Sequence, residues 1–214
     1  MKNKNIIIFG DSYSTFAGCI PEGYGVYYSG CRESGPDINS KDESWWGMLM
    51  NELGANLVRN DSWSGATIGY RGYNDLDASE FNSFIYRLRK LNREGFFVEN
   101  KIDTVLVLGG TNDSWCGAEI GEEMREGWRE EDLYRVLPAI WCYFKELRAV
   151  FPDAQIYGIC NCGIHAEIIE AIKNVCRDIG ATAIELHDID KLEDHPTALG
   201  MIQIKDQVLN AMTK

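Results

Sequence analysis

The sequence predicts an α/β protein built on a doubly wound, five-stranded parallel sheet with helices on both faces. Short apolar runs alternate along the chain with longer stretches of helical periodicity, which is the pattern of strand-helix units around a parallel sheet. Three of the five runs are almost entirely apolar, as expected of strands that are covered on both faces. Right-handed crossovers and short connections then favour the strand order 2-1-3-4-5.

The strands are predicted where aliphatic residues gather in short runs: Asn5–Phe9, Asn56–Arg59, Thr104–Leu108, Gln155–Cys160 and Thr182–Leu186. The helices are predicted over the periodic stretches between and after them: Trp45–Leu53, Glu80–Arg93, Glu131–Val150, Ala166–Ile179 and Pro196–Met212. Residues that stop helices, Gly54, Pro152 and Gly180, follow three of these stretches.

Two long segments fit neither pattern, Gly18–Ser44 and Ser114–Glu130. Loops of this length in a compact domain usually cover or shape a site. No repeat, low-complexity tract or linker divides the chain, and 214 residues suit one domain of ordinary size. We therefore expect residues 1–214 to form a single domain.

The charge balance bears on partners and location. The chain has 21 Lys and Arg against 33 Asp and Glu, and this net charge of −12 repels phosphate backbones and anionic lipid surfaces. We therefore expect neither nucleic acid nor membrane as a partner. The apolar run Ile6–Phe9 is too short for a membrane span or a secretory signal, and seven cysteines, an odd number, indicate reduced thiols. These features predict a cytoplasmic protein, unless a leader peptide has been removed; they leave the oligomeric state unknown.

Two reactive side chains follow the first and last predicted strands. Ser12 lies in a Gly-Asp-Ser turn directly after the first strand, where it could act as a nucleophile or cap a helix. His195 precedes Pro196, a residue favoured at the first position of a helix, so His195 is expected at or next to the N-cap of the last helix. An imidazole there could accept a proton from Ser12, or it could simply face solvent.

Two further strand ends carry groups that can donate hydrogen bonds. Gly65 follows the second strand in a polar turn, where its bare N–H could approach a ligand or serve only the turn. Asn112 follows two glycines after the third strand and offers either a fixed amide donor or an Asx turn. Because the carboxyl ends of parallel strands meet at one edge of a sheet, we expect these groups to gather there with Ser12 and His195. Together they are the components of acyl transfer.

These residues resemble the sequence blocks of the SGNH (GDSL-type) hydrolases and esterases. Gly10-Asp11-Ser12 resembles the first block, Gly65 the glycine of the second, Gly110-Thr111-Asn112-Asp113 the third, and His195-Pro196 the histidine of the last. The resemblance implies a serine esterase or acylhydrolase that cleaves a carboxylic ester, such as an O-acetyl ester of a small carbohydrate. It also implies that Ser12 is the nucleophile and His195 the general base, with an oxyanion hole formed by Ser12, Gly65 and Asn112.

One position departs from that family pattern. The family's last block usually reads Asp-x-x-His, but Leu192 stands three residues before His195. Either one of the nearby acids Asp190, Glu193 and Asp194 reaches the imidazole from a differently shaped loop, or a backbone carbonyl orients it in a Ser-His dyad. We expect the dyad.

The predicted serine esterase needs no cofactor and no metal. The Cys160, Cys162 and His165 group lacks the spacing and the fourth ligand of a zinc site. Two alternatives remain open. The missing acid would suit a catalytically silent interaction domain on the same fold, and the hydroxyl-rich turn after the first strand would suit a flavodoxin-like phosphate or flavin carrier.

Overall fold

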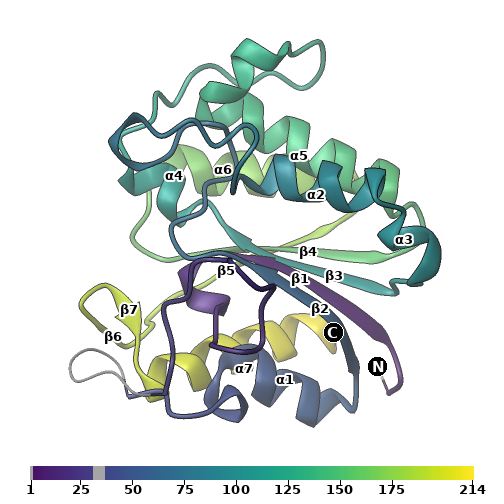
Figure 1. Cartoon of the computed structure of the whole chain (residues 1–214), viewed down its shortest axis with the longest axis vertical. Coiled ribbons are helices and arrows are strands. Elements are labelled where there is room, and N and C mark those ends of the chain that lie inside the picture. The colour runs from purple at the N-terminus through teal and green to yellow at the C-terminus, as the bar shows by residue number, and fades with distance from the viewer. Residues whose placement is uncertain (1, 31–36) are drawn as a thin grey trace.

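A single parallel sheet organises the protein. The computed structural model describes residues 2–30 and 37–214. Five parallel strands lie in the order β2-β1-β3-β4-β5 (Figure 1), which confirms the predicted topology. Their bounds are β1 Asn5–Gly10, β2 Asn56–Ser62, β3 Thr104–Gly109, β4 Gln155–Cys160 and β5 Thr182–Glu185.

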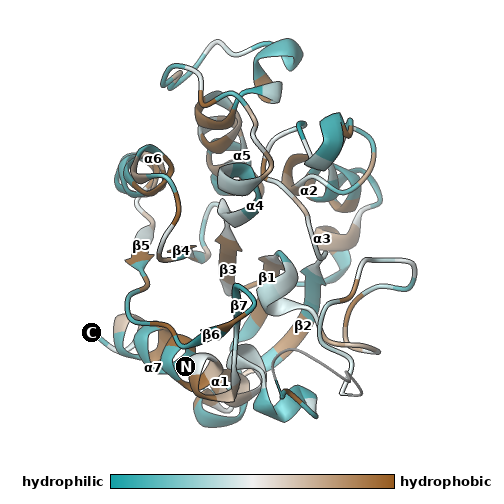
Figure 2. Ribbon diagram, turned by 90° about the vertical axis from the view of Figure 1, so that its left-hand side faces the viewer, coloured by the Kyte–Doolittle hydropathy of each residue, from teal (hydrophilic) through white to brown (hydrophobic). Residues whose placement is uncertain are grey.

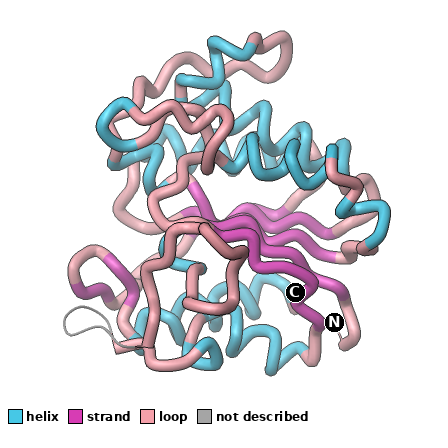
Figure 3. The backbone as a smooth tube through the Cα atoms, viewed as in Figure 1, coloured by secondary structure: helices cyan, strands magenta, loops and turns pink. Residues whose placement is uncertain are grey.

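Helices cover both faces of this sheet, as the two views of the backbone show (Figures 1 and 3). One face carries the helices α2 Phe84–Arg93, α3 Phe96–Glu99, α5 Val136–Val150 and α6 Ala166–Asp178, with the short α4 Thr111–Trp115 at the end of β3. The other face carries α1 Trp45–Leu53 and α7 Ala198–Met212. Short 3₁₀ turns cover Ser12–Ser14, Lys41–Glu43, Tyr73–Asp75 and Glu130–Tyr134.

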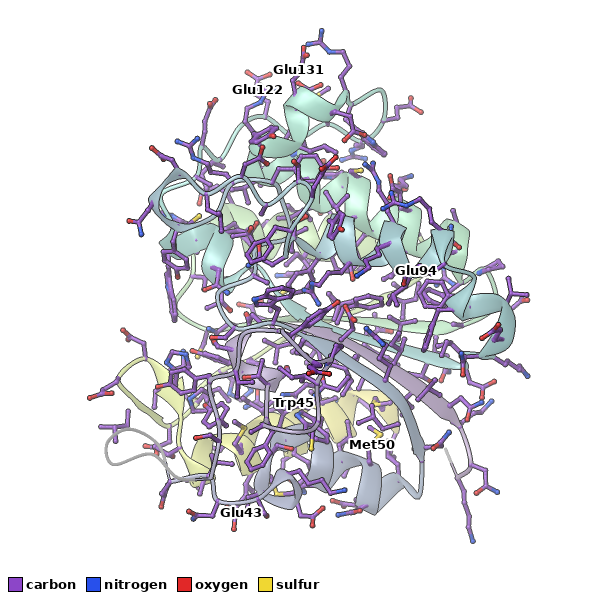
Figure 4. All side chains as sticks on the ribbon, viewed as in Figure 1. Glu43, Trp45, Met50, Glu94, Glu122 and Glu131 are labelled. Atoms are coloured by element: carbon purple, nitrogen blue, oxygen red, sulfur yellow. The ribbon has the colours of Figure 1, made fainter. Side chains whose placement is uncertain are left out.

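The apolar strands divide their side chains between two cores. Ile7 and Phe9 of β1 pack with the α2, α5 and α6 side, whereas Ile6 and Ile8 pack with α1 and α7. Successive residues of a strand point to opposite faces, so a strand buried on both faces must be apolar throughout. Figure 2 accordingly shows β1 and β3 largely in brown between the helical layers, and in Figure 4 Trp45 lies between α1 and the sheet.

Several predicted boundaries were wrong, each for a local reason. The third long helix was predicted from Glu131 but begins at Val136. Proline is tolerated only in the first turn of a helix, so Pro138 must lie close to the start of this one. The second was predicted from Glu80 but begins at Phe84, where the Ser83 hydroxyl caps the N–H of Tyr86.

The start of the last helix is the correction with consequences for function. Pro196 is not its first residue. The Thr197 hydroxyl accepts a hydrogen bond from the N–H of Gly200, so α7 begins at Ala198. His195 and Pro196 instead form the strand β7 (His195–Pro196), which pairs antiparallel with β6 (Lys191–Leu192).

The two long unassigned segments have different outcomes. Residues 31–36 of the first lie outside the described residues. Its remaining part contributes Tyr27, and the second contributes Trp115, to a depression at the carboxyl edge of the sheet. Within residues 2–30 and 37–214, no helix has both the length and the apolar character needed to cross a membrane.

Candidate active site

Ser12 lies where β1 ends, in a turn of tightly packed chain. A Cβ added at Gly10 would come within 2.5 Å of the Ser62 hydroxyl and 2.6 Å of the Ser14 Cβ, so only glycine fits there. The Asp11 side chain then caps the 3₁₀ turn by accepting the N–H of Tyr13 at 3.0 Å. The capping role considered for Ser12 therefore belongs to Asp11, and the Ser12 side chain makes a different contact.

His195 lies in a short β-hairpin whose turn has two residues. The turn residues Glu193 and Asp194 have φ of 49° and 61°. Positive φ at both central residues is the signature of a type I′ turn, whose twist matches that of the strands it joins. The hairpin β6–β7 stands at the carboxyl edge of the sheet (Figures 1 and 2). It brings the imidazole to the end of β1, although 183 residues separate His195 from Ser12.

Hydroxyl groups hold this hairpin in place. The Tyr13 hydroxyl donates to the carbonyl of Asp194 at 2.5 Å, and the Tyr28 hydroxyl donates to the carbonyl of Pro196 at 3.0 Å. At the base, the Thr197 hydroxyl donates to the carboxylate of Asp190. Both tyrosines come from the chain that follows β1, so the nucleophile turn and the hairpin are attached to each other.

The imidazole is in contact with the serine. His195 Nε2 lies 3.0 Å from Ser12 Oγ, and Nδ1 lies 3.0 Å from the carbonyl oxygen of Glu193. A carbonyl can only accept a hydrogen bond, so Nδ1 carries the proton and the lone pair of Nε2 faces the hydroxyl. The Tyr27 ring stacks on the imidazole, with centroids 3.5 Å apart and planes 7° from parallel.

None of the three candidate acids bonds the imidazole through its carboxylate within the described part of the chain. Asp190 is engaged at the base of the hairpin, and Glu193 contributes its backbone carbonyl. The Leu192 position pairs across the hairpin with His195 itself. Leu192, three residues before His195, therefore lies opposite it in the hairpin.

Asn112 and Gly65 border the same serine. Asn112 lies in the first turn of α4; its Nδ2 donates to the carbonyl of Ala66 at 2.9 Å, and its Oδ1 accepts from the Tyr73 hydroxyl at 2.9 Å. Because the Ala66 carbonyl can only accept, it fixes which end of the amide is nitrogen. The second hydrogen on Nδ2 has no acceptor among the described residues. The backbone N–H groups of Ser12 and Gly65 have no acceptor within the described ranges.

Buried carboxylates hold the loops that carry these groups. Asp113 accepts the N–H groups of Ile68 and Gly69 at 2.9–3.2 Å and so ties the chain after β2 to α4. Burial raises the pKa of Asp113 to about 6, against the opposing effect of these backbone bonds. Burial likewise raises the pKa of Asp11, next to the serine, to about 7.

A buried ion pair fixes the ends of β1 and β2. Arg87 of α2 reaches Asp61 with Nη1 2.9 Å from Oδ2, and both side chains are fully buried. The same guanidinium donates to the carbonyl of Gly10 at 3.3 Å and to that of Asp61. One side chain therefore holds the strand ends that lead to Ser12 and to Gly65.

All four predicted site residues line one depression of about 310 Å³: Ser12, Gly65, Asn112 and His195. We call it the Ser12 depression. Only 4% of the Ser12 residue is exposed, and the exposed part faces this space. Aromatic side chains, Tyr27, Tyr73 and Trp115, supply much of the remaining wall. The depression therefore opens onto both the Ser12 hydroxyl and the His195 imidazole.

Three of the contributors to the site were not predicted from the sequence. Tyr27 belongs to the long segment Gly18–Ser44, which was expected to cover or shape a site, but nothing in its spacing indicated a stack on the imidazole. Tyr73, which orients Asn112, lies in a 3₁₀ turn of polar residues that carries no recognisable pattern. The Glu193 carbonyl follows from the hairpin, which the sequence did not predict.

The described cysteines and histidines form no metal-binding group. Within residues 2–30 and 37–214, no cluster of three or more His, Cys, Asp or Glu side chains could hold an ion. The ring of His187 is exposed and contacts the carboxylate of the neighbouring Asp188.

The sequence places the chain in a known family. The chain matches the model of the GDSL-like lipase/acylhydrolase family over residues 4–212, so it belongs to that family and is an ester hydrolase by class. A search of the curated proteins found no significant match.

Two solved structures are similar in sequence as well as in fold. A protein from Bacteroides ovatus, provisionally assigned as a GDSL-like lipase, is 36% identical, with a TM-score of 0.91 over 100% of this chain and 99% of its own. A protein from Bacteroides uniformis with the same assignment is 37% identical, with a TM-score of 0.89 over 99% of this chain and 96% of its own.

A more distant neighbour shares the fold alone. The acetyl xylan esterase from the rumen bacterium Butyrivibrio proteoclasticus is 17% identical, with a TM-score of 0.61 over 98% of this chain and 63% of its own.

Proposed function

We propose that the protein is a serine esterase that cleaves a carboxylic ester of a short acyl group, such as an O-acetyl ester, through an acyl-enzyme on Ser12. The observation that carries the proposal is the 3.0 Å contact between Ser12 Oγ and the unprotonated Nε2 of His195 at the base of an accessible depression. A nucleophile and a base within hydrogen-bond reach, with the base oriented by a third group, are the requirements for covalent acyl transfer.

The first half-reaction follows from this contact. Ser12 Oγ attacks the carbonyl carbon while His195 Nε2 takes the hydroxyl proton. The tetrahedral intermediate then collapses, the bond to the alcohol oxygen breaks, and the imidazolium returns its proton to that oxygen. Water repeats the sequence on the acyl-enzyme, which releases the acid and restores the serine.

The negative oxygen of the intermediate needs donors that are already in place. The N–H groups of Ser12 and Gly65 and the second amide hydrogen of Asn112 border the same space and are not used by other groups in the described chain. Donors held in advance stabilise developing charge without reorganising during the reaction. The Tyr73 hydroxyl and the Ala66 carbonyl keep the Asn112 amide in its orientation.

The imidazole has two structural supports besides a carboxylate. The Glu193 carbonyl holds the proton on Nδ1, which is the tautomer that a general base at Nε2 requires. The stacked Tyr27 ring presents its electron-rich face to the imidazolium that forms during attack. A base oriented by a carbonyl therefore suits the Ser-His dyad expected from the sequence.

Hydrolysis of ethyl acetate, followed by titration of the released acid, tests the proposal. We expect the parent to release acetate and Ser12→Ala to lose nearly all of this activity, with its thermal melt unchanged within a few degrees. A Ser12→Ala variant that keeps a tenth of the parental rate would refute the nucleophile.

A second measurement separates an active enzyme from a silent relative on the same fold. A fluorophosphonate probe should label the parent at Ser12 and leave Ser12→Ala unlabelled. His195→Gln should also resist labelling, because its side-chain amide cannot take the proton. A parent that is not labelled and hydrolyses no ester would favour the interaction-domain reading over an esterase.

A further inference from the structure

A second hollow adjoins the Ser12 depression. It has a volume of about 650 Å³ and is lined by Ser114, Trp115, Cys162, Gly163, Lys191 and Asp194. We call it the Trp115 crevice. Trp115 and Asp194 line both hollows, so the two lie side by side with these residues at their border. A substrate whose carbonyl reaches Ser12 therefore has room to extend into the crevice.

Trp115 stands next to the proposed oxyanion donor. Asn112 and Trp115 are three residues apart on α4, and residues at that spacing are neighbours on one face of a helix. The indole is 36% exposed, a large apolar surface at the junction of the two hollows. A ring attached to the ester held between Ser12 and Asn112 would lie against it.

The crevice opens on the side where the leaving group must be. Asp194 directly precedes His195 on the hairpin and lines the crevice. In the proposed reaction, His195 Nε2 returns its proton to the alcohol oxygen, so that oxygen faces the hairpin. The geometry therefore directs the alcohol toward the crevice, and leaves the rest of the Ser12 depression for the acyl group.

Polar groups surround the indole, and each has bonding capacity left. Lys191 Nζ donates to Asn161 Oδ1 and to the Cys162 carbonyl, both at 3.2 Å, which uses two of its three hydrogens. The Ser114 hydroxyl accepts the N–H of His165 at 3.0 Å and keeps its own hydrogen. The carboxylate of Asp194 accepts no hydrogen bond from the described part of the chain.

We infer that the Trp115 crevice binds the alcohol half of the ester and that this alcohol is a carbohydrate. A sugar ring has an apolar face that can pack on an indole and a rim of hydroxyls that both donate and accept hydrogen bonds. Lys191 and Ser114 supply donors to that rim, and Asp194 supplies an acceptor. A long alkyl chain would instead strand these polar groups without partners, which is costly.

This inference rests on the proposed esterase activity, so the test compares two esters. Monoacetylated xylobiose fills the crevice with sugar, whereas ethyl acetate has an alcohol too small to reach it; the readout is the ratio of their kcat/KM values. We expect the parent to favour the sugar ester at least tenfold. Trp115→Ala should lower this ratio about tenfold, mainly through KM, while Trp115→Phe keeps part of it.

Two further variants guard against a general loss of structure. Lys191→Met keeps the aliphatic stem and removes the donor, and should lower the ratio several-fold. Tyr134 is the matched control, because its exposure is also 36% and it lines neither hollow. Tyr134→Ala should leave the ratio at the parental value.

The outcomes separate the subsite from the activity. A parent that hydrolyses both esters equally well, or a ratio that Trp115→Ala does not change, overturns the carbohydrate subsite and leaves the esterase standing. A parent that hydrolyses neither ester, and shows no Ser12-dependent labelling, overturns both. Inhibition of ethyl acetate hydrolysis by free xylobiose, weakened in Trp115→Ala, would support the subsite without reference to the sugar ester's own turnover.

Discussion

Replacing Asn112 with alanine is a sharp test of the proposed oxyanion hole. The change removes the amide hydrogen that would meet the negative oxygen, and loss of one such donor typically lowers kcat by ~10²–10³. It also removes the two bonds that hold the amide, the one to Ala66 and the one from Tyr73. At about 1 kcal/mol net for each, the variant should lose ~2 kcal/mol of stability.

That loss leaves the protein folded, because domains of this kind are stable by about 5–15 kcal/mol. The kinetic effect can therefore be measured separately from the structural one. The assays are kcat for ethyl acetate at saturating substrate and urea denaturation followed by tryptophan fluorescence. We expect a large drop in kcat, little change in KM, and a modest shift of the urea midpoint.

Tyr73→Phe is the matched control for this variant. It removes the hydroxyl that orients the amide but leaves the amide itself, so we expect a loss of less than tenfold in kcat. Asn112→Ala with the parental kcat would refute the oxyanion role. If Tyr73→Phe lost as much activity as Asn112→Ala, the amide would be acting through the order of the loop rather than as a donor.

Three further predictions concern neighbouring groups. Tyr27→Leu removes the ring stacked on the imidazole, so kcat should fall several-fold, whereas Tyr27→Phe keeps the ring and should lose less; equal losses in the two variants would contradict the stacking role. Burial raises the pKa of Asp11 from 3.8 to about 7. Between these two pH values the folded state holds a proton that the unfolded state has released. The free energy of unfolding is therefore highest below about pH 4 and falls as the pH rises to about 7. In thermal melts, Asp11→Asn should therefore lose less Tm than the parent between about pH 5 and 8, while exposed Asp188→Asn follows the parent; parallel curves for Asp11→Asn and the parent would count against this assignment. Arg87→Met leaves the buried Asp61 with Arg59 and the Tyr24 hydroxyl as partners and should cost about 3 kcal/mol in urea unfolding, so a loss near zero would show that the pair contributes little.

The parts of the fold that could be predicted are those in which one physical requirement decides the residue type. A strand covered on both faces must be apolar, and Asn5–Phe9 and Thr104–Leu108 therefore stood out. The order of the sheet then followed from the handedness of crossovers, and the edge at which the strand ends meet followed from that order. This is why Ser12 and Asn112 could be brought together in advance.

The hairpin could not be predicted in this way. Its strands have two residues each, too few for any periodicity, and its turn is Glu193-Asp194 rather than the Asn-Gly or Asp-Gly pairs that mark type I′ turns. Pro196 favoured a helix start, and only the tertiary contacts of the hairpin outweighed that preference. The position of His195 near the serine was predicted, but the element that carries it was wrong.

Contacts between distant loops were equally beyond the sequence. The stack of Tyr27 on the imidazole and the bond of Tyr13 to the turn both join the chain after β1 to the hairpin. Neither contact produces a recognisable sequence pattern, because each joins two loops that are distant in the sequence. Residues of this kind are found only once the fold is known.

The small size of the hairpin has a consequence for how the protein responds to heat. Its two strands share a single short ladder, and the anchors to the rest of the chain include the hydroxyls of Tyr13 and Tyr28. Small elements with few buried contacts open at lower free energy than the sheet they stand on. Turnover should consequently fade on warming before the far-ultraviolet circular dichroism changes, and return on cooling. We therefore expect local opening of the hairpin to limit catalysis at a temperature below the global melt.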